Sequence, residues 1–365
     1  MDEPKQPGGL LSSSWRRSLC KKLLAWFGEN ARDLPWRRTK DLFAIWISEI
    51  MLQQTQVVTV VPYWQRFLAR FPDARALAAA DEQEVLRLWE GLGYYRRARQ
   101  LHAAARKIAS DHGGQFPTTY HAVRELAGIG RYTAGAILSI GRDQRLPILE
   151  ANTIRVLSRL TAYQGDPATS AGQKHLWSIA EQILPAKDCG AFNQALMELG
   201  SEVCSPKAPA CESCPVASLC ESRMLGLVAQ IPTPAKRTQY EDVTEVAVIV
   251  RARGRVLLRQ CQPGERWAGL WDFPRFAVSG DGALADEIAA RTSELAGIDV
   301  SAGERLATLK HGVTRFRITL HCYAAATNSP ARAISKSARW VKPADLADYP
   351  LSTTGRKISR LLTGV

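Results

Sequence analysis

The sequence predicts a multidomain fold in which an all-α domain is followed by a smaller α/β domain. Up to about residue 225, apolar residues recur at helical spacing, as at 84–88 and 101–108. The segment Ile-Pro-Thr-Pro-Ala-Lys-Arg at 231–237 is typical of a stiff, basic linker. Beyond it, a strand-turn-strand pattern at 245–259 and an alternating run at 316–322 indicate β-structure. A chain of 365 residues is long enough for two hydrophobic cores.

These patterns divide the chain into four parts. We expect a disordered tail over residues 1–14, a helical domain over 15–225, a linker over 226–240 and an α/β domain over 241–365. The tail has no charged-then-apolar export pattern, and no apolar run is long enough to span a bilayer. We therefore expect a cytoplasmic protein with no membrane partner.

The chain is basic, with 48 Lys and Arg against 35 Asp and Glu and a formal net charge of +13. Such a balance fits a polyanionic partner, because cationic side chains that bind phosphates release counterions. A solvated basic surface without such a partner has the same composition, so charge alone does not separate the two.

Four of the eight cysteines gather in one short segment. They are Cys204, Cys211, Cys214 and Cys220, and the successive gaps between them are six, two and five residues. A disulfide framework is not expected in so large a chain without a secretion signal. Four thiolates this close in sequence can surround one metal centre, either an iron–sulfur cluster or a zinc ion.

A Gly-x-Gly turn at Gly128 and Gly130 joins two helical stretches. Two glycines permit a tight turn whose backbone N–H groups point at an anion, next to the positive end of the following helix. A plain helix–helix turn would have the same sequence.

Two acids lie in apolar surroundings. Glu49 stands within the helical run 46–55, where desolvation would raise its pKa and make it a proton donor near neutral pH. The alternative is that Glu49 faces solvent. Glu150, in Pro-Ile-Leu-Glu-Ala-Asn at 147–152, is a second candidate, and the alternative is that it caps the helix that follows.

The segment 91–99, Gly-Leu-Gly-Tyr-Tyr-Arg-Arg-Ala-Arg, suits contact with DNA. A tyrosine on a glycine-flexed loop can wedge into a base step while arginines hold phosphates. The alternative is a pair of core aromatics beside a solvated arginine face.

Taken together, these motifs resemble those of the MutY-type adenine DNA glycosylases in the endonuclease III, or helix-hairpin-helix, superfamily. The resemblance rests on the cysteine spacing, the hairpin at 126–137 and the string Ile-Met-Leu-Gln-Gln-Thr-Gln at 50–56. The segment Trp-Ala-Gly-Leu-Trp-Asp-Phe-Pro at 267–274 is similar to the Nudix-like module with which these enzymes check for 8-oxoguanine. The resemblance implies a helix-hairpin-helix at about 122–142, an iron–sulfur loop at 204–220 and a Nudix-like recognition domain at 241–365.

For catalysis, the resemblance implies that Glu49 is the general acid that protonates the departing adenine. Glu150 stands where the family usually has the Asp of Asp-Gly-Asn, with Asn152 completing the pattern, and would stabilise the cationic sugar. Tyr132 occupies the position at which endonuclease III-type lyases carry a lysine. A phenol cannot form a Schiff base, so the expected enzyme is a monofunctional glycosylase in which Tyr132 hydrogen-bonds the catalytic acids.

For binding, the resemblance implies a [4Fe–4S] cluster on the four cysteines and a monomer on duplex DNA that carries an A:8-oxoguanine or A:G mispair, in the nucleoid. Tyr94 would be the wedge beside the oxidised guanine. Where the family often reads Phe-Ser-His, this chain has Thr314 and Arg315, which supply a hydroxyl and a phosphate contact. The other expected base or backbone contacts are Trp36, Arg37 and Gln194 for adenine, Gln53 and Gln54 near the opening, and Gly128 and Gly130 for phosphate.

Two other functions remain open at this point. One is a lesion-binding protein that has lost catalysis through the change to Glu150, which would bind the mispair without releasing the base. The other is an endonuclease III-like glycosylase and lyase, which would cleave the strand without alkali.

Overall fold

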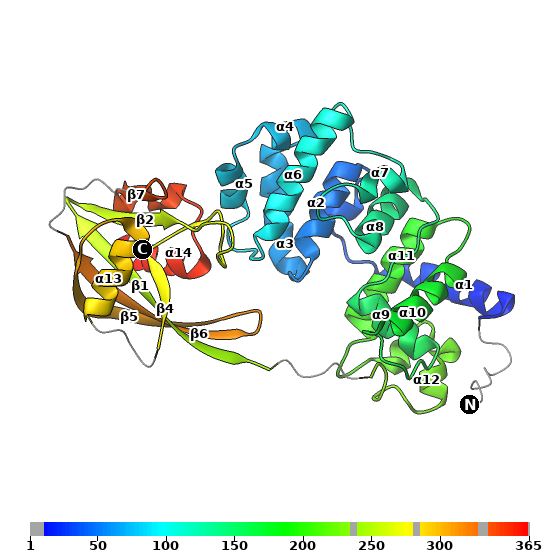
Figure 1. The fold of residues 1–365 in the computed structure, drawn as a ribbon. Helices are drawn as coiled ribbons and strands as arrows, with labels where there is room; N and C mark the ends of the chain where they lie inside the picture. Colours follow the sequence, from blue (N-terminus) through cyan, green and yellow to red (C-terminus); the bar gives the residue numbers. More distant parts are fainter. Residues whose placement is uncertain (1–10, 234–238, 280–284, 328–334, 364–365) are drawn as a thin grey trace. The chain divides into compact units, whose positions relative to one another are not determined.

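The computed structural model describes residues 11–233, 239–279, 285–327 and 335–363, and the chain divides into two compact units (Figure 1). One comprises Met1–Ala79 with Gln100–Lys236, and the other comprises Ala80–Arg99 with Arg237–Val365. The predicted order of an all-α part followed by an α/β part is confirmed. The helical segment Ala80–Arg99 clusters with the α/β part, which the periodicity did not indicate.

The first unit is entirely helical where it is described. Most of the expected tail, residues 1–10, and residues 234–238 of the expected linker lie outside the described residues, and the first helix begins at Ser13. The helices of this unit are α1 (Ser13–Asn30), α2 (Leu42–Leu52), α3 (Val57–Arg70), α4 (Ala74–Ala79), α6 (Arg96–Asp111, its first residues in the other unit), α7 (Tyr120–Arg124), α8 (Arg131–Arg142), α9 (Ala151–Leu160), α10 (Ser170–Ile183), α11 (Cys189–Glu198) and α12 (Glu221–Met224). Short helical turns lie at Pro35–Arg37, Leu199–Val203, Cys211–Ser213 and Ala217–Leu219. Among all described residues, no helix is long and apolar enough to cross a membrane.

Helix α8 is the centre of this unit, because α2, α7 and α11 all pack against it. Nearly all of its residues from Thr133 on are buried. Glycine allows the closest approach: a Cβ on Gly190 of α11 would lie 2.2 Å from the backbone oxygen of Ser139. This close crossing brings side chains from α2, α8 and α11 around one space.

The second unit contains a mixed seven-stranded sheet, in which the order of five strands is β3-β2-β1-β6-β5. The parallel pair β1 and β6 lies at its middle, β4 pairs with β1, and β7 pairs with β2. The strands are β1 (Glu241–Ala252), β2 (Arg255–Gln260), β3 (Trp271–Asp272), β4 (Arg275–Val278), β5 (Ser301–Val313), β6 (Phe316–Ala326) and β7 (Ala338–Val341). The helices are α5 (Glu82–Leu88), α13 (Ala285–Ala296) and α14 (Thr353–Thr363), with a 3-10 helix at Pro343–Asp348.

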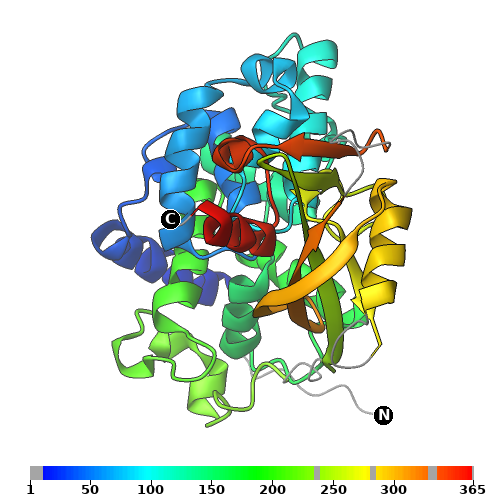
Figure 2. The same cartoon turned by 90° about the vertical axis from the view of Figure 1, so that its left-hand side faces the viewer.

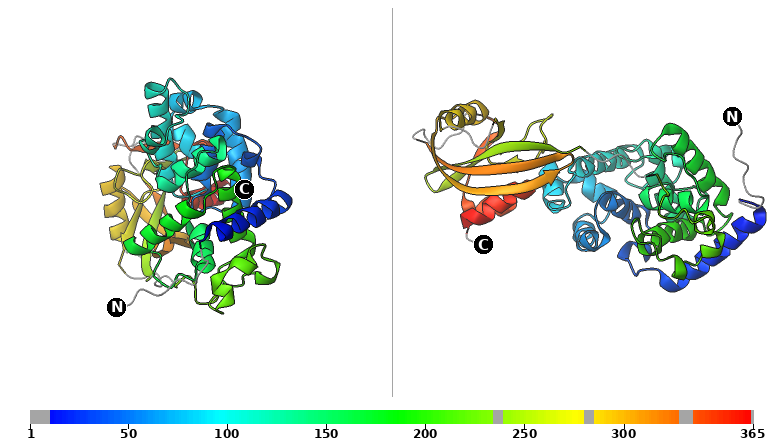
Figure 3. Two further views of the ribbon diagram at one scale, coloured as in Figure 1. Left: turned by 90° about the vertical axis from the view of Figure 1, so that its right-hand side faces the viewer. Right: turned by 90° about the horizontal axis from the view of Figure 1, so that it is seen from below.

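Helices α13 and α14 cover opposite faces of the sheet (Figures 2 and 3). The alternation along β1 explains this arrangement, since successive side chains of a strand point to opposite faces. Val246 and Val248 pack in a core with Ile288 of α13, whereas Ala247 and Ile249 pack in a second core with Ile358 of α14. Both faces of the sheet are therefore covered at this strand, and residues 246–250 of β1 form a continuous apolar run.

Gly190→Ala tests the close crossing of α8 and α11. The added methyl would meet the Ser139 backbone oxygen, so we expect a loss of about 1–3 kcal/mol in the free energy of unfolding. Gly28→Ala in α1 is the control, because nothing lies within 4 Å of its Cβ position. That variant should be neutral, or stabilised by up to about 1 kcal/mol. Urea unfolding checks both, and equal stability of the two variants would contradict the crossing.

Candidate active site

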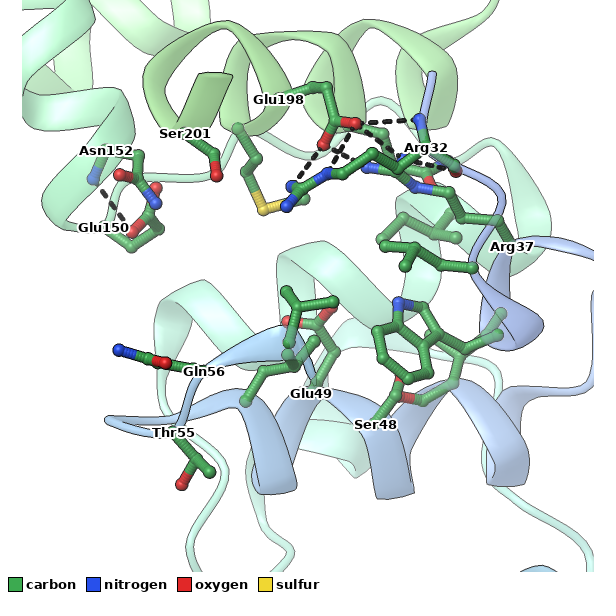
Figure 4. A pocket seen from close by; sticks show the side chains of 18 of the residues that line it. Arg32, Arg37, Ser48, Glu49, Thr55, Gln56, Glu150, Asn152, Glu198 and Ser201 are labelled. Atoms are coloured by element: carbon green, nitrogen blue, oxygen red, sulfur yellow. Dashed lines mark hydrogen bonds and ion pairs between the residues drawn. The ribbon is translucent and has the colours of Figure 1, made fainter. Parts of the chain in front are cut away.

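A cavity of about 530 Å³ opens between α2, α8, α9 and α11 (Figure 4). It brings together seven of the side chains singled out from the sequence, all from the first unit. These are Trp36, Arg37, Glu49, Tyr132, Glu150, Asn152 and Gln194. The cavity is therefore the candidate active site.

Glu49 is buried in the wall of this cavity and is only 6% exposed. It sits in α2, where every residue from Leu42 to Met51 is buried. Burial raises the pKa of the Glu49 carboxyl to about 7, and the negative charge of Glu150 adds to the rise, against the hydrogen bond from Tyr132 and the charge of Arg37. The alternative that Glu49 faces solvent is wrong. Its carboxyl group can therefore hold a proton near neutral pH.

Tyr132 provides the direct polar contact to this carboxyl group. It lies in the first turn of α8, and its hydroxyl donates to Glu49 Oε2 at 2.8 Å. Burial, followed by the charges of Glu49 and Glu150, raises the pKa of the Tyr132 phenol well above its ordinary value. The hydroxyl therefore stays protonated and remains a donor to the acid.

Glu150 is both a helix cap and a wall of the cavity. Its Oε2 accepts from the Asn152 N–H and its Oε1 from the Thr153 N–H, both at 2.9 Å. The Thr153 hydroxyl in turn accepts from the Glu150 N–H, which completes a capping box for α9. Burial raises the pKa of Glu150, whereas the two N–H bonds favour its ionised form. The side chain bends back onto the helix end, where each carboxylate oxygen accepts one backbone N–H.

A cluster of charged residues, of which only Arg37 was predicted from the sequence, closes the other side of the cavity. Glu198 is fully buried and accepts from both guanidinium groups of Arg32 and Arg37, with closest N···O distances of 2.6 and 2.9 Å. Burial alone would raise the pKa of Glu198, but the hydrogen bonds from the two arginines lower it to about 2. Glu202 binds Arg32 at 2.8 Å. The signal in the sequence was an acid within the apolar run 195–199, as for Glu49.

Trp36 and Gln194 line the same cavity in different ways. Trp36 is 7% exposed and packs edge-on against Trp64, so it is a core residue and a cavity wall together. Gln194 donates to the Gly190 backbone oxygen of its own helix at 3.3 Å.

The other predicted contacts lie outside the cavity. Gln54 has a left-handed backbone with φ of 58°, and the neighbouring Gln53 donates to the Thr133 hydroxyl at 3.5 Å. Gly128 has a φ of 79°, as the tight turn requires, whereas Gly130 is the extended N-cap residue of α8 with nothing within 4 Å of its Cβ position. Gly130 is exposed, and no side chain caps the N-terminus of α8.

Three more predicted contacts belong to the second unit. Tyr94 is half exposed in a loop with a φ of 47°. Thr314 and Arg315 form the exposed two-residue turn between β5 and β6, with Thr314 at a φ of 52°.

The four clustered cysteines line one cavity of about 30 Å³ together with Arg159 of α9. All four are half-buried free thiols. Arg159 donates to Cys204 Sγ at 3.3 Å, and Cys220 Sγ donates to the backbone oxygen of Arg159 at 3.3 Å. Within the described parts of the chain, no three His, Cys, Asp or Glu side chains converge closely enough to hold one metal ion. The donors and the cationic neighbour suit a larger thiolate-bound group.

Known families match both parts of the chain. The family of HhH-GPD superfamily base excision DNA repair proteins matches residues 47–182, and the NUDIX domain family matches residues 245–361. Among solved structures, a thermostable thymine-DNA glycosylase is 28% identical, with a TM-score of 0.54 over 58% of this chain and 98% of that chain. Endonuclease III in a non-covalent DNA complex shares the fold of the helical part, with a TM-score of 0.51 at 18% identity over 60% of this chain and 99% of that chain.

Curated relatives are similar over a longer stretch. The adenine DNA glycosylase of Rattus norvegicus is 34% identical over 400 residues, which cover 93% of this chain and 77% of that protein. That of Buchnera aphidicola subsp. Schizaphis graminum is 36% identical over 255 residues, 70% of this chain and 74% of that protein. The two acids of one cavity and the turn at Gly128 between α7 and α8 are consistent with these similarities. The chain belongs to the adenine DNA glycosylase family of the HhH-GPD superfamily.

Proposed function

We propose that this adenine DNA glycosylase removes adenine mispaired with 8-oxoguanine or guanine, with Glu49 as the general acid and Glu150 as the group that stabilises the sugar cation. The observation that carries the proposal is a buried carboxyl group, with a pKa of about 7, in the same cavity as a second carboxylate. Two acids whose environments separate their protonation states can divide acid and electrostatic roles. The cavity volume of about 530 Å³ is within the range of sites for base-sized ligands.

The chemistry follows from these two groups. Adenine leaves poorly as an anion, so proton transfer from Glu49 to a ring nitrogen lets the base depart as a neutral molecule with the electron pair of the C–N bond. The Glu150 carboxylate stabilises the positive charge left on the sugar. A water oxygen then bonds to the sugar carbon, and the proton it loses returns to Glu49. No amine takes part, because Tyr132 stands at the position of the lyase lysine.

Adenine recognition is assigned to Trp36, Arg37 and Gln194. Trp36 presents an aromatic wall, while Arg37 and Gln194 supply donors and an acceptor that a base edge can bind. The buried carboxylate of Glu198 holds the Arg37 guanidinium in the cavity wall. An arginine held in this way loses little side-chain entropy when the base arrives.

Contacts to the rest of the DNA are assigned to exposed turns. The N–H groups at Gly128 and Gly130 suit a backbone phosphate, as the open N-terminus of α8 suggests. Gln53, Gln54 and Tyr94 are proposed to act at the opened base pair, with Asn152 beside the sugar. Thr314 would offer its hydroxyl to the base opposite adenine and Arg315 would bind a phosphate, and their place at an exposed hairpin turn supports these roles.

Cys204, Cys211, Cys214 and Cys220 are proposed to hold a [4Fe–4S] cluster, which would supply a structural link across the loop at 204–220. A single tetrahedral zinc ion, with Zn–S bonds of about 2.3 Å, would need the sulfur atoms to converge more closely than a cluster does. The Arg159 guanidinium lies against Cys204 Sγ and offsets thiolate charge. In this proposal, the four cysteines and Arg159 keep the loop folded against α9.

The proposed reaction predicts a defined pattern of base release. In single-turnover assays, adenine should leave quickly from a duplex with A opposite 8-oxoguanine, more slowly opposite G, and slowest opposite C and T. Glu49→Gln should retain binding but slow release by about 10²–10⁴-fold, since it cannot donate the proton. Tight binding without release by the unaltered protein would instead indicate a lesion-binding protein. Strand cleavage without alkali would indicate a lyase.

The pH dependence should report Glu49. Its protonated form is the active one, so the rate should fall as the pH rises above about 7. Tyr132→Phe removes a hydrogen bond that favours the ionised form, so the pKa should rise and the falling limb should move to higher pH. Single-turnover rates between pH 5 and 9, set as an approximate window around that pKa, check this. A limb that stays in place, or moves to lower pH, would contradict the role of Tyr132.

The cluster proposal predicts bound iron and broad visible absorption in the purified protein. Cys214→Ser should lower the iron content and the unfolding temperature, because that thiol lines the cavity. Cys20→Ser is the control, since Cys20 of α1 lines a different cavity, together with Arg145 and Leu184. Zinc in place of iron in the unaltered protein would overturn the assignment.

A further inference from the structure

The loop that carries Tyr94 is held in a backbone geometry that needs support. Gly91, Gly93 and Tyr94 all have positive φ, at 101°, 70° and 47°. For a tyrosine this left-handed conformation costs roughly 1–2 kcal/mol, so surrounding contacts must maintain it. The result is a Tyr94 ring that is 50% exposed.

Part of that support comes from the loop itself. The Trp89 indole N–H donates to the Gly93 oxygen at 3.1 Å. The buried Arg97 guanidinium donates to the oxygens of Leu92 and Gly93 at 3.2 and 3.3 Å. The same guanidinium lies 5.6 Å from the centre of the Tyr94 ring.

The rest comes from a residue far away in the sequence, Leu351, whose two backbone groups hold the two ends of the loop. The Leu351 N–H donates to Glu90 Oε2 at 3.3 Å, immediately before Gly91. The Tyr95 hydroxyl donates to the Leu351 oxygen at 3.4 Å, immediately after Tyr94. Leu351 is itself fully buried and bridges to Trp271 of β3.

Arg356 of α14 completes this clamp. Its Nε and Nη2 bind the two carboxylate oxygens of Glu90 at 2.6 and 2.9 Å. Its remaining donors reach the oxygens of Leu346 and Tyr349, at 2.8 and 2.7 Å. Both side chains of the pair are less than one-fifth exposed, at 19% and 17%. A bidentate arginine–carboxylate pair of this kind fixes the relative orientation of the two groups and also stabilises their contact.

We propose that Arg356 is a positioning residue for mispair recognition: through Glu90 it holds the Tyr94 loop in the geometry that presents the ring to DNA. The inference rests on the proposed function, in which Tyr94 acts at the opened base pair. In this proposal the α/β part of the chain has two roles. Its exposed β5–β6 turn contacts DNA, and its helix α14 supports a loop that comes from the helical part of the sequence.

A double-mutant cycle in the full chain tests this. Each variant carries Glu49→Gln so that no base is released, and dissociation constants are measured for an A:8-oxoguanine duplex and for a fully paired duplex. The readout is the ratio of the two constants, because loss of a positive charge weakens both duplexes alike. Arg356→Gln should lower this selectivity about tenfold, and should lower it less than about twofold when Tyr94→Ala is already present. Arg360→Gln, at an exposed site on the same helix, should leave the ratio unchanged.

Each other outcome has a definite meaning. If Arg356→Gln lowers the selectivity equally with and without Tyr94→Ala, Arg356 does not act through Tyr94. A silent Arg356→Gln beside a damaging Tyr94→Ala would refute this inference alone. A silent Tyr94→Ala would refute the proposed role of Tyr94 and the inference with it. If Arg356→Gln does not fold, Glu90→Gln breaks the same pair from the other side and must give the same non-additivity with Tyr94→Ala.

Discussion

The burial of Glu49 in an apolar helix is the constraint on which the rest of the site depends. Taking a carboxylate out of water costs more than one phenol hydrogen bond returns, so the group keeps its proton near neutral pH. That condition requires a dry wall around α2, which the packing of α8 supplies. The same helix places the Tyr132 hydroxyl 2.8 Å from Glu49 Oε2, close enough to orient the carboxyl group, and this bond lowers the pKa that burial raises.

Three acids around one cavity illustrate how neighbours set charge. Burial raises the pKa of Glu49 to about 7 although a phenol donates to it, and Glu150 accepts from two backbone N–H groups. Glu198 accepts from two guanidinium groups, which lower its pKa to about 2. All three are glutamates in mainly apolar segments. Their different tasks follow from what each carboxyl group touches, because one pKa unit corresponds to about 1.4 kcal/mol of differential interaction.

The division of the chain follows contacts rather than periodicity. Helix α5 and the loop after it have a helical sequence pattern, yet their polar side chains bind the α/β part. The Gln83 amide donates to the Gly269 oxygen and accepts from the Trp271 indole N–H. Glu90 forms an ion pair with Arg356. A loop in which three of four successive residues, Gly91, Gly93 and Tyr94, have positive φ cannot hold one shape by itself. Its geometry is therefore a property of both segments together.

Sequence patterns alone predict the order of the all-α and α/β parts, the turn at Gly128, the cysteine loop and the buried acid in α2. Each feature depends on residues close together in the sequence, where periodicity, spacing and turn chemistry act locally. The fold was needed to show that Glu150 caps its own helix and also lines the cavity, and that Arg32 and Arg37 meet Glu198. The Arg32–Glu198 pair spans 166 residues, and the clamp between Glu90 and Arg356 spans 266. Local patterns carry no information on which distant charges meet, since that depends on the path of the whole chain and on where glycines let helices approach.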